Sequence, residues 1–65
     1  MNVVKLKKAI DESGITITAL AGKAEISRGA LYAKLESGEF RVTEARRISD
    51  ALRLTDAEKI DIFFN

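Results

Sequence analysis

A short segment, AEISRGALYAKLESG at residues 24–38, contains the side chains best suited to recognition chemistry. An arginine guanidinium donates two hydrogen bonds that fit O6 and N7 of guanine, so Arg28 is the strongest candidate for reading a base. Small residues beside Arg28 leave room for close approach, and Tyr32 offers a ring to a thymine methyl or a hydroxyl to a phosphate. We therefore predict base contacts from one face, made by Arg28, Gly29, Tyr32 and Ala33.

The same segment offers two groups to a phosphate. Lys34 supplies a point charge, and Ser27 stands where exposed backbone N–H groups and the helix dipole favour an anion. Simpler interpretations remain open for each residue: a solvated cation for Arg28 or Lys34, a ring packed on a neighbouring helix for Tyr32, and a helix cap alone for Ser27. A glycine inside a helix costs about 1 kcal/mol relative to alanine, so Gly29 favours a need for close approach.

Composition excludes most catalytic chemistry. The chain has 65 residues and contains no cysteine and no histidine, so it lacks disulfides, thiolate metal sites and the commonest proton-transfer group. We therefore predict one domain, residues 1–65, with no catalytic or metal-binding residue and no cofactor. No apolar run is long enough for a bilayer, and the first ten residues lack the apolar core of a signal peptide, so we expect a cytoplasmic protein.

Charge is distributed unevenly along the chain although the net charge is only +1. Residues 1–10 and 28–47 are basic, and residues 11–27 and 48–65 are acidic. Such polarity permits a nucleic-acid face, although a solvated surface is the commoner explanation for it.

Apolar residues recur at helical spacing, which predicts an all-α fold of five short helices. The third helix, residues 28–36, turns Leu31 and Leu35 towards the core, and Gly38 lies just beyond its end. Its neighbours are delimited by residues that typically cap helices: Gly14 after the first helix, Thr16 before the second, Ser27 before the third, Thr43 before the fourth and a capping box at residues 55–58 before the fifth. The inner stripe of the fourth helix consists of Ala45, Ile48, Ala51 and Leu52.

Two segments have alternating β-branched patterns, and a hairpin between them is the alternative. We predict a helix for residues 14–20, because Thr16 is well placed as a cap. For residues 39–43 we predict an extended connection with Phe40 and Val42 packed inward. Arg46 and Arg47 are expected on the outer side of the fourth helix, paired with Glu44 or Asp50.

Residues 14–38, with LA at residues 20–21, ISR at residues 26–28 and LESG at residues 35–38, resemble the helix-turn-helix of phage Cro and repressor-like regulators. The following RVTEARRISDALRLTDAEKIDIFF is similar to the helices that close this fold. The resemblance implies a compact five-helix domain whose third helix enters the major groove of double-stranded operator DNA. It implies phosphate contacts from Thr16, Thr18 and Arg41, and no small-molecule ligand.

The chain departs from this family at two positions before the third helix. Ile17 stands where glutamine is usual, so the phosphate contact made there is either lost or supplied by Thr16, Thr18 or a backbone N–H. Glu25 stands where glycine is usual in the turn. Glutamate tolerates positive φ poorly, so we predict a strained or differently shaped turn. The third helix is also one residue longer than in many relatives.

The end of the chain, IDIFFN, has two interpretations. Ile60, Phe63 and Phe64 share a helical face, which closes the core or, through Phe63 and Phe64, pairs two copies weakly. Regulators of this type often pair through their final segment. The leading prediction is a sequence-specific DNA-binding transcriptional regulator. The alternative is a protein-interaction module, antitoxin-like or antirepressor-like, which a large apolar patch around these phenylalanines would favour.

Overall fold

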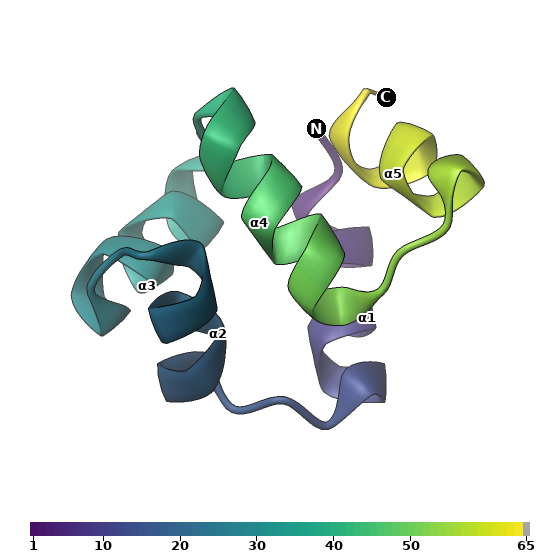
Figure 1. Ribbon diagram of the computed structural model, residues 1–65. Coiled ribbons are helices and arrows are strands. Elements are labelled where there is room, and N and C mark those ends of the chain that lie inside the picture. Colours follow the sequence, from purple (N-terminus) through teal and green to yellow (C-terminus); the bar gives the residue numbers. More distant parts are fainter. Residues whose placement is uncertain (65) are drawn as a thin grey trace.

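The structure is a computed structural model that describes residues 1–64, and these form five α-helices and no strand (Figure 1). The helices are α1 (Val3–Ser13), α2 (Ile17–Ala24), α3 (Arg28–Ser37), α4 (Val42–Leu52) and α5 (Asp56–Phe63). The predicted all-α class is therefore confirmed, and the predicted domain extends one residue, Asn65, beyond the described part. None of the helices in residues 1–64 is long and apolar enough to cross a membrane.

Two predicted N-caps define where α2 and α3 begin. Thr16 Oγ1 accepts the backbone N–H of Ala19 at 3.1 Å, and Ser27 Oγ accepts that of Ala30 at 3.0 Å. Each bond satisfies one of the N–H groups that the first turn of a helix leaves unpaired. Residues 14–20 are therefore not a strand, and the alternative hairpin does not form.

Glycines end two of the helices as predicted. Gly14 and Gly38 both have a φ of 74°, in the left-handed region where a side chain would be strained. The capping box at the start of α5 is also confirmed, because Thr55 and Glu58 each bond the backbone N–H of the other.

The start of α4 differs from the prediction. The N-cap is Arg41 rather than Thr43, because the Glu44 carboxylate accepts the Arg41 backbone N–H at 2.8 Å and so favours a start two residues earlier. Val42 is consequently the first helical residue and 86% exposed, so the prediction that it packs inward was wrong. Phe40 does pack against the core, as predicted.

The turn between α2 and α3 is strained at the predicted residue. Glu25 has φ 60° and ψ 39°, in the left-handed region, and its N–H donates to the Gly22 carbonyl. Its carboxylate Oε2 lies 3.0 Å from Arg47 Nε on α4. Arg47 therefore pairs with Glu25 in the turn. The predicted partners, Glu44 and Asp50, were wrong for Arg47, because the packing of the helices brings α4 alongside α2.

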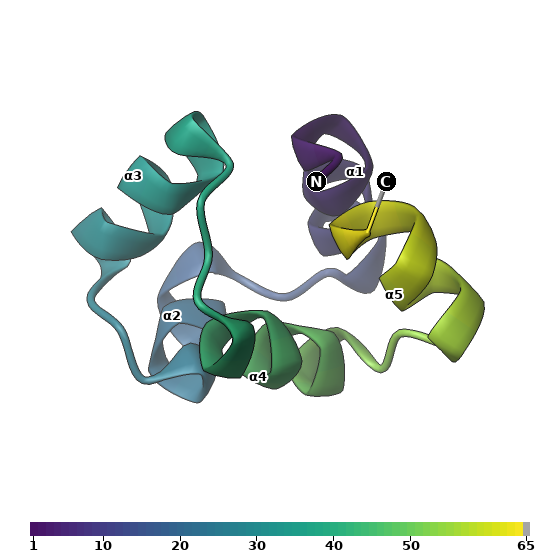
Figure 2. The same cartoon turned by 90° about the horizontal axis from the view of Figure 1, so that it is seen from above.

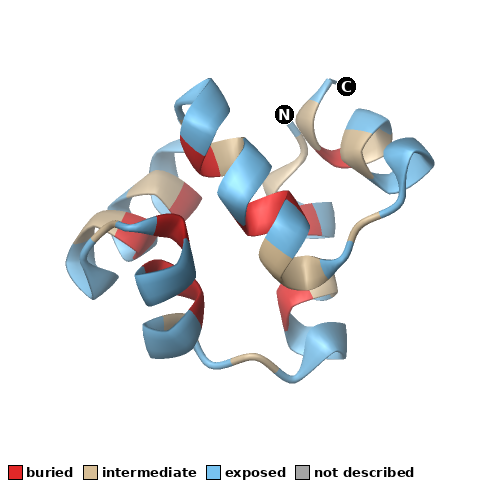
Figure 3. Cartoon of the chain, in the orientation of Figure 1, coloured by how far each residue is buried: buried red, intermediate tan, exposed pale blue. Residues whose placement is uncertain are grey.

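One apolar core joins all five helices. Figure 2 shows α1 and α3 on one side and α2 with α4 on the other, and the buried stretches lie on the inner sides of these helices (Figure 3). Ile48 is the buried centre of the inner stripe of α4, while the other predicted members of that stripe are half-buried. The core residues are Leu6, Ile10, Leu20, Ala21, Ala24, Leu31, Leu35, Ile48 and Ile62.

The last helix is held mainly to α1. Lys5 Nζ lies 2.7 Å from both carboxylate oxygens of Asp61, and the Asn2 N–H donates to the Ile62 carbonyl at 2.7 Å. The two chain ends therefore lie close together (Figure 1).

The predicted inward face of α5 is only partly correct. Phe63 packs against the core, but Ile60 is exposed and Phe64 is 80% exposed. The buried residue of this helix is Ile62, which was not part of the predicted face. Because α5 contacts the body along only one side, near α1, a residue two positions from Ile62 on the helix points away from it.

Candidate nucleic-acid interface

The outer face of α3 carries all four residues predicted to contact bases. Arg28, Gly29, Tyr32 and Ala33 are exposed, while Leu31 is fully buried. Gly29 and Ala33 point away from the buried leucines, and Arg28 is exposed as the first residue of the helix. Leu31 and Leu35 lie one turn apart and dock the helix on the core, which fixes the direction of the outer face. The helix that carries this predicted set, α3, lies at the edge of the molecule (Figure 1).

Arg28 and Tyr32 contact each other on this face. The Arg28 Cζ atom lies 5.8 Å from the centroid of the Tyr32 ring, one helical turn away. A cation over the face of an aromatic ring is attracted by the ring quadrupole, by about 0.5–1 kcal/mol at an exposed site. The contact holds the guanidinium along the helix surface, and Tyr32 remains exposed rather than buried under a neighbouring helix.

Gly29 is not required by the fold. A Cβ atom added at this position would meet no atom within 4 Å outside its own helix, and its backbone is an ordinary helical one. The same is true of Gly22 in α2. An alanine would fit in either place and would favour the helix, so Gly29 narrows the outer face of α3 without any structural need.

The N-termini of α2 and α3 carry three of the predicted phosphate ligands. Thr16, Thr18 and Ser27 are exposed. The cap hydroxyls of Thr16 and Ser27 already accept a backbone N–H, but a hydroxyl also has a proton to donate. Each is therefore free to donate to a phosphate oxygen without loss of the cap.

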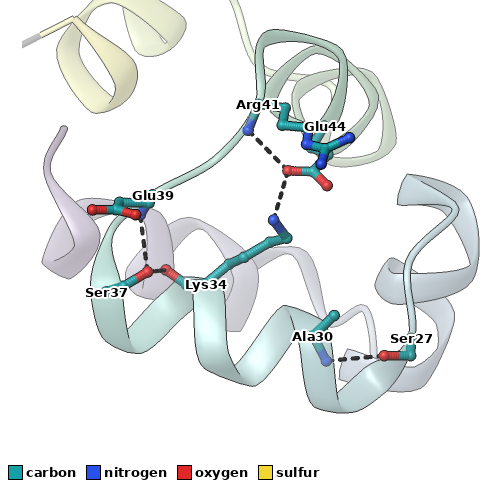
Figure 4. Close-up of polar contacts among 7 residues, drawn as sticks. All are labelled: Ser27, Ala30, Lys34, Ser37, Glu39, Arg41 and Glu44. Atoms are coloured by element: carbon teal, nitrogen blue, oxygen red, sulfur yellow. Dashed lines mark hydrogen bonds and ion pairs between the residues drawn. The ribbon is translucent and has the colours of Figure 1, made fainter.

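Lys34 has an ion-pair partner that sequence reasoning missed. Its Nζ lies 3.0 Å from Oε1 of Glu44, and the two side chains are only 24% and 9% exposed (Figure 4). The same Glu44 oxygen accepts the Arg41 backbone N–H. Glu44 and Lys34 lie ten residues apart on different helices, so no local spacing rule links them.

The environment of Glu44 stabilises its charged form. The Arg41 backbone N–H, followed by the Lys34 ammonium, lowers the pKa of this carboxyl below its ordinary value of 4.5, against the opposing effect of burial. The Arg41 guanidinium adds a smaller effect in the same direction. Glu44 is therefore a buried carboxylate that links the start of α4 to α3 through two contacts, one with the Arg41 N–H and one with the Lys34 ammonium.

A second candidate surface is an apolar groove between α4 and the end of α5. Its volume is about 440 Å³, and both phenylalanines predicted to pair two copies line it. Sequence reasoning missed Val42 here, because its exposure depends on where α4 begins. The lining residues include Met1, Phe40, Val42, Phe63 and Phe64, with Arg46, Lys59 and Glu39 as charged members.

Comparison with models of protein families, with curated proteins and with solved structures finds no match to this chain.

Protonation of Glu44 is expected to destabilise the fold. Because the folded-state pKa is lowered, the stabilisation is present above about pH 4.5 and is lost as the pH falls through the folded-state pKa. Urea unfolding followed by circular dichroism should show Glu44→Gln less stable than wild type at about pH 7, with a smaller difference near pH 3. Glu36→Gln, which changes an exposed carboxylate on α3, is the control. An equal difference at both pH values would contradict the assignment.

Proposed function

We propose that this chain is a sequence-specific DNA-binding domain in which α2 and α3 act as a helix-turn-helix. The observation that carries the proposal is the outer face of α3: one cation beside an aromatic ring, small residues, and an apolar opposite side that is buried. A B-DNA major groove is about 12 Å wide and admits one helix, provided that its leading face is narrow. Gly29 and Ala33 keep that face narrow.

Arg28 is the residue proposed to read a base. Its position in the first turn of α3 suits the geometry in which the N-terminal residues of a recognition helix meet base edges. A bidentate contact to guanine discriminates against the wrong base by about 1–3 kcal/mol. Tyr32, one turn further along, would hold the guanidinium in place and contact a thymine methyl or a phosphate.

Phosphate contacts would fix the register of the domain on the duplex. Thr16, Thr18 and Ser27 would donate hydroxyl protons, and the N-termini of α2 and α3 supply backbone N–H groups beside them. Arg41 is exposed in the connection before α4. With the resemblance to phage Cro-like proteins, this arrangement supports a transcriptional regulator of the bacterial cytoplasm that acts by occupying its operator.

A second candidate function, a protein-interaction module, is favoured by the groove between α4 and α5. We propose that its occupant is a second copy of this chain. Phe64 both lines the groove and projects from it, so a two-fold related copy would bury both phenylalanines in one self-complementary contact. The groove carries Glu39 as well as Arg46 and Lys59, so such a copy also has charges of both signs to pair.

Substitution of Arg28 tests the DNA-binding proposal. A duplex selected from a random pool is compared with a scrambled duplex of equal composition across a salt series. Arg28→Ala should weaken binding to the selected duplex by about 1–3 kcal/mol and relax sequence preference, because a base contact is lost. Arg53→Ala, at the end of α4 and outside the groove, is the matched control and should bind as wild type. If wild type showed neither sequence preference nor salt dependence, the proposal would fail.

Gly29→Ala should have opposite effects on the stability of the fold and on the affinity for DNA. The substitution should raise the free energy of unfolding by about 1 kcal/mol, because alanine favours a helix and the space is open. It should nevertheless weaken binding to the selected duplex, because a methyl group widens the face that enters the groove. Gly22→Ala, in an equally open place on α2, is the control and should gain stability without losing affinity. Unchanged affinity of Gly29→Ala would exclude close approach at this position.

Self-association tests the second candidate. Sedimentation equilibrium over a concentration series should show wild type forming a dimer and Phe64→Glu remaining a monomer, because a buried carboxylate in the contact is unfavourable. Val4→Glu changes an equally exposed apolar residue outside the groove and should dimerise as wild type. A wild type that stays monomeric at all concentrations, with and without a two-half-site duplex, would exclude pairing through this groove.

A further inference from the structure

Lys34 lies on the helix proposed to enter DNA, but its charge is directed away from the outer face. Its side chain runs from α3 towards the start of α4, where its ammonium meets the Glu44 carboxylate at 3.0 Å (Figure 4). Glu44 is itself held by the Arg41 backbone N–H at 2.8 Å, so the acceptor is fixed in position. The pair is therefore a built contact between two helices rather than a chance meeting of two mobile side chains.

This pairing determines how much positive charge α3 can offer to DNA. The charged residues of α3 are Arg28, Lys34 and Glu36. With Lys34 neutralised by Glu44, the remaining two have opposite signs, and the helix presents no net positive charge. Non-specific binding depends on how many phosphates a protein neutralises, so α3 in this state contributes little to it.

We propose that Glu44 withholds the Lys34 ammonium from the DNA backbone and so sets the strength of sequence-independent binding. The inference rests on the proposed DNA-binding function and concerns its electrostatic part. A base contact from Arg28 adds affinity only at the correct sequence, whereas a lysine on a phosphate adds affinity at every sequence. By keeping Lys34 paired, Glu44 lowers the affinity for every DNA sequence by about the same factor and makes binding less dependent on salt.

The test uses wild type, Glu44→Gln, Lys34→Gln and the double variant, each titrated against the selected and the scrambled duplex across a salt series. Glutamine at position 44 retains an oxygen for the Arg41 N–H, and a circular dichroism melt checks that each variant is folded. Glu44→Gln should bind the scrambled duplex about 3- to 10-fold more tightly, with a salt slope steeper by about 0.9, as expected for one added phosphate contact. The selected duplex should gain affinity by about the same factor, because a phosphate contact adds affinity at every sequence.

Two comparisons show whether the gain comes from Lys34. Lys34→Gln should change the wild-type slope little but should return Glu44→Gln to the wild-type slope. Glu36→Gln removes one negative charge from the same helix without releasing Lys34, so Lys34→Gln should have little effect in that background.

Three results would overturn the inference. Glu44→Gln could bind both duplexes as wild type or more weakly, which would make Glu44 a structural residue only. Lys34→Gln could reduce the wild-type salt slope by about 0.9, which would show that Lys34 already contacts phosphate. This measurement tests the inference even if Glu44→Gln does not fold. Absence of any wild-type binding would overturn the proposed function as well, whereas normal wild-type binding with either of the first two results overturns this inference alone.

Discussion

Every other feature of this domain depends on the burial of four aliphatic side chains, one from each of the first four helices. Leu6, Leu20, Leu31 and Ile48 are the largest fully buried side chains and belong to a single core cluster. Burying such a side chain contributes about 1.5–3 kcal/mol, and a domain of this size has only a few kcal/mol of net stability. Loss of one of these side chains would therefore remove a large part of the free energy of unfolding. The packing of the core also fixes the helices and so the directions of the residues on their surfaces.

Leu31 connects that core to the candidate interface. Because side chains on a helix are separated by about 100°, burying Leu31 and Leu35 places Gly29 and Ala33 on the outside, whereas Arg28 is exposed because it is the first residue of α3. The proposed recognition face is thus a consequence of hydrophobic docking, and the small residues on it are not needed for packing. Because packing and the proposed recognition use different side chains, the outer face can be changed without loss of the fold, as expected of a site placed on a rigid element.

One carboxylate oxygen of Glu44, Oε1, makes two structural contacts. It satisfies the backbone N–H at the start of α4, and it neutralises a lysine of α3. Burying a carboxylate costs free energy unless it accepts hydrogen bonds or pairs with a cation. Glu44 has one contact of each kind. As a result, the position at which α4 begins and the charge that α3 presents are linked through the same side chain, although the two helices are joined by an extended connection (Figure 4).

The sequence by itself determined most helix boundaries, because their causes are local. Thr16, Ser27 and Gly38 act on backbone groups within four residues, and the spacing of Leu31 and Leu35 shows which side of α3 is buried. The strained turn at Glu25 was also predicted, through the resemblance to a family in which glycine is usual at this position. The start of α4 was predicted wrongly, because Thr43 and Glu44 are both plausible signals and the glutamate prevailed.

Only the tertiary structure decided which charged and apolar groups are available. Lys34 with Glu44, and Glu25 with Arg47, are pairs between helices, and their distances follow from the packing of the core rather than from any sequence interval. The same packing left Phe64 beside Val42 on an open groove although a helical pattern suggested an inward face. Local hydrogen bonds and periodicity are encoded within one or two turns, whereas an ion pair or a groove exists only once the helices have fixed positions relative to one another.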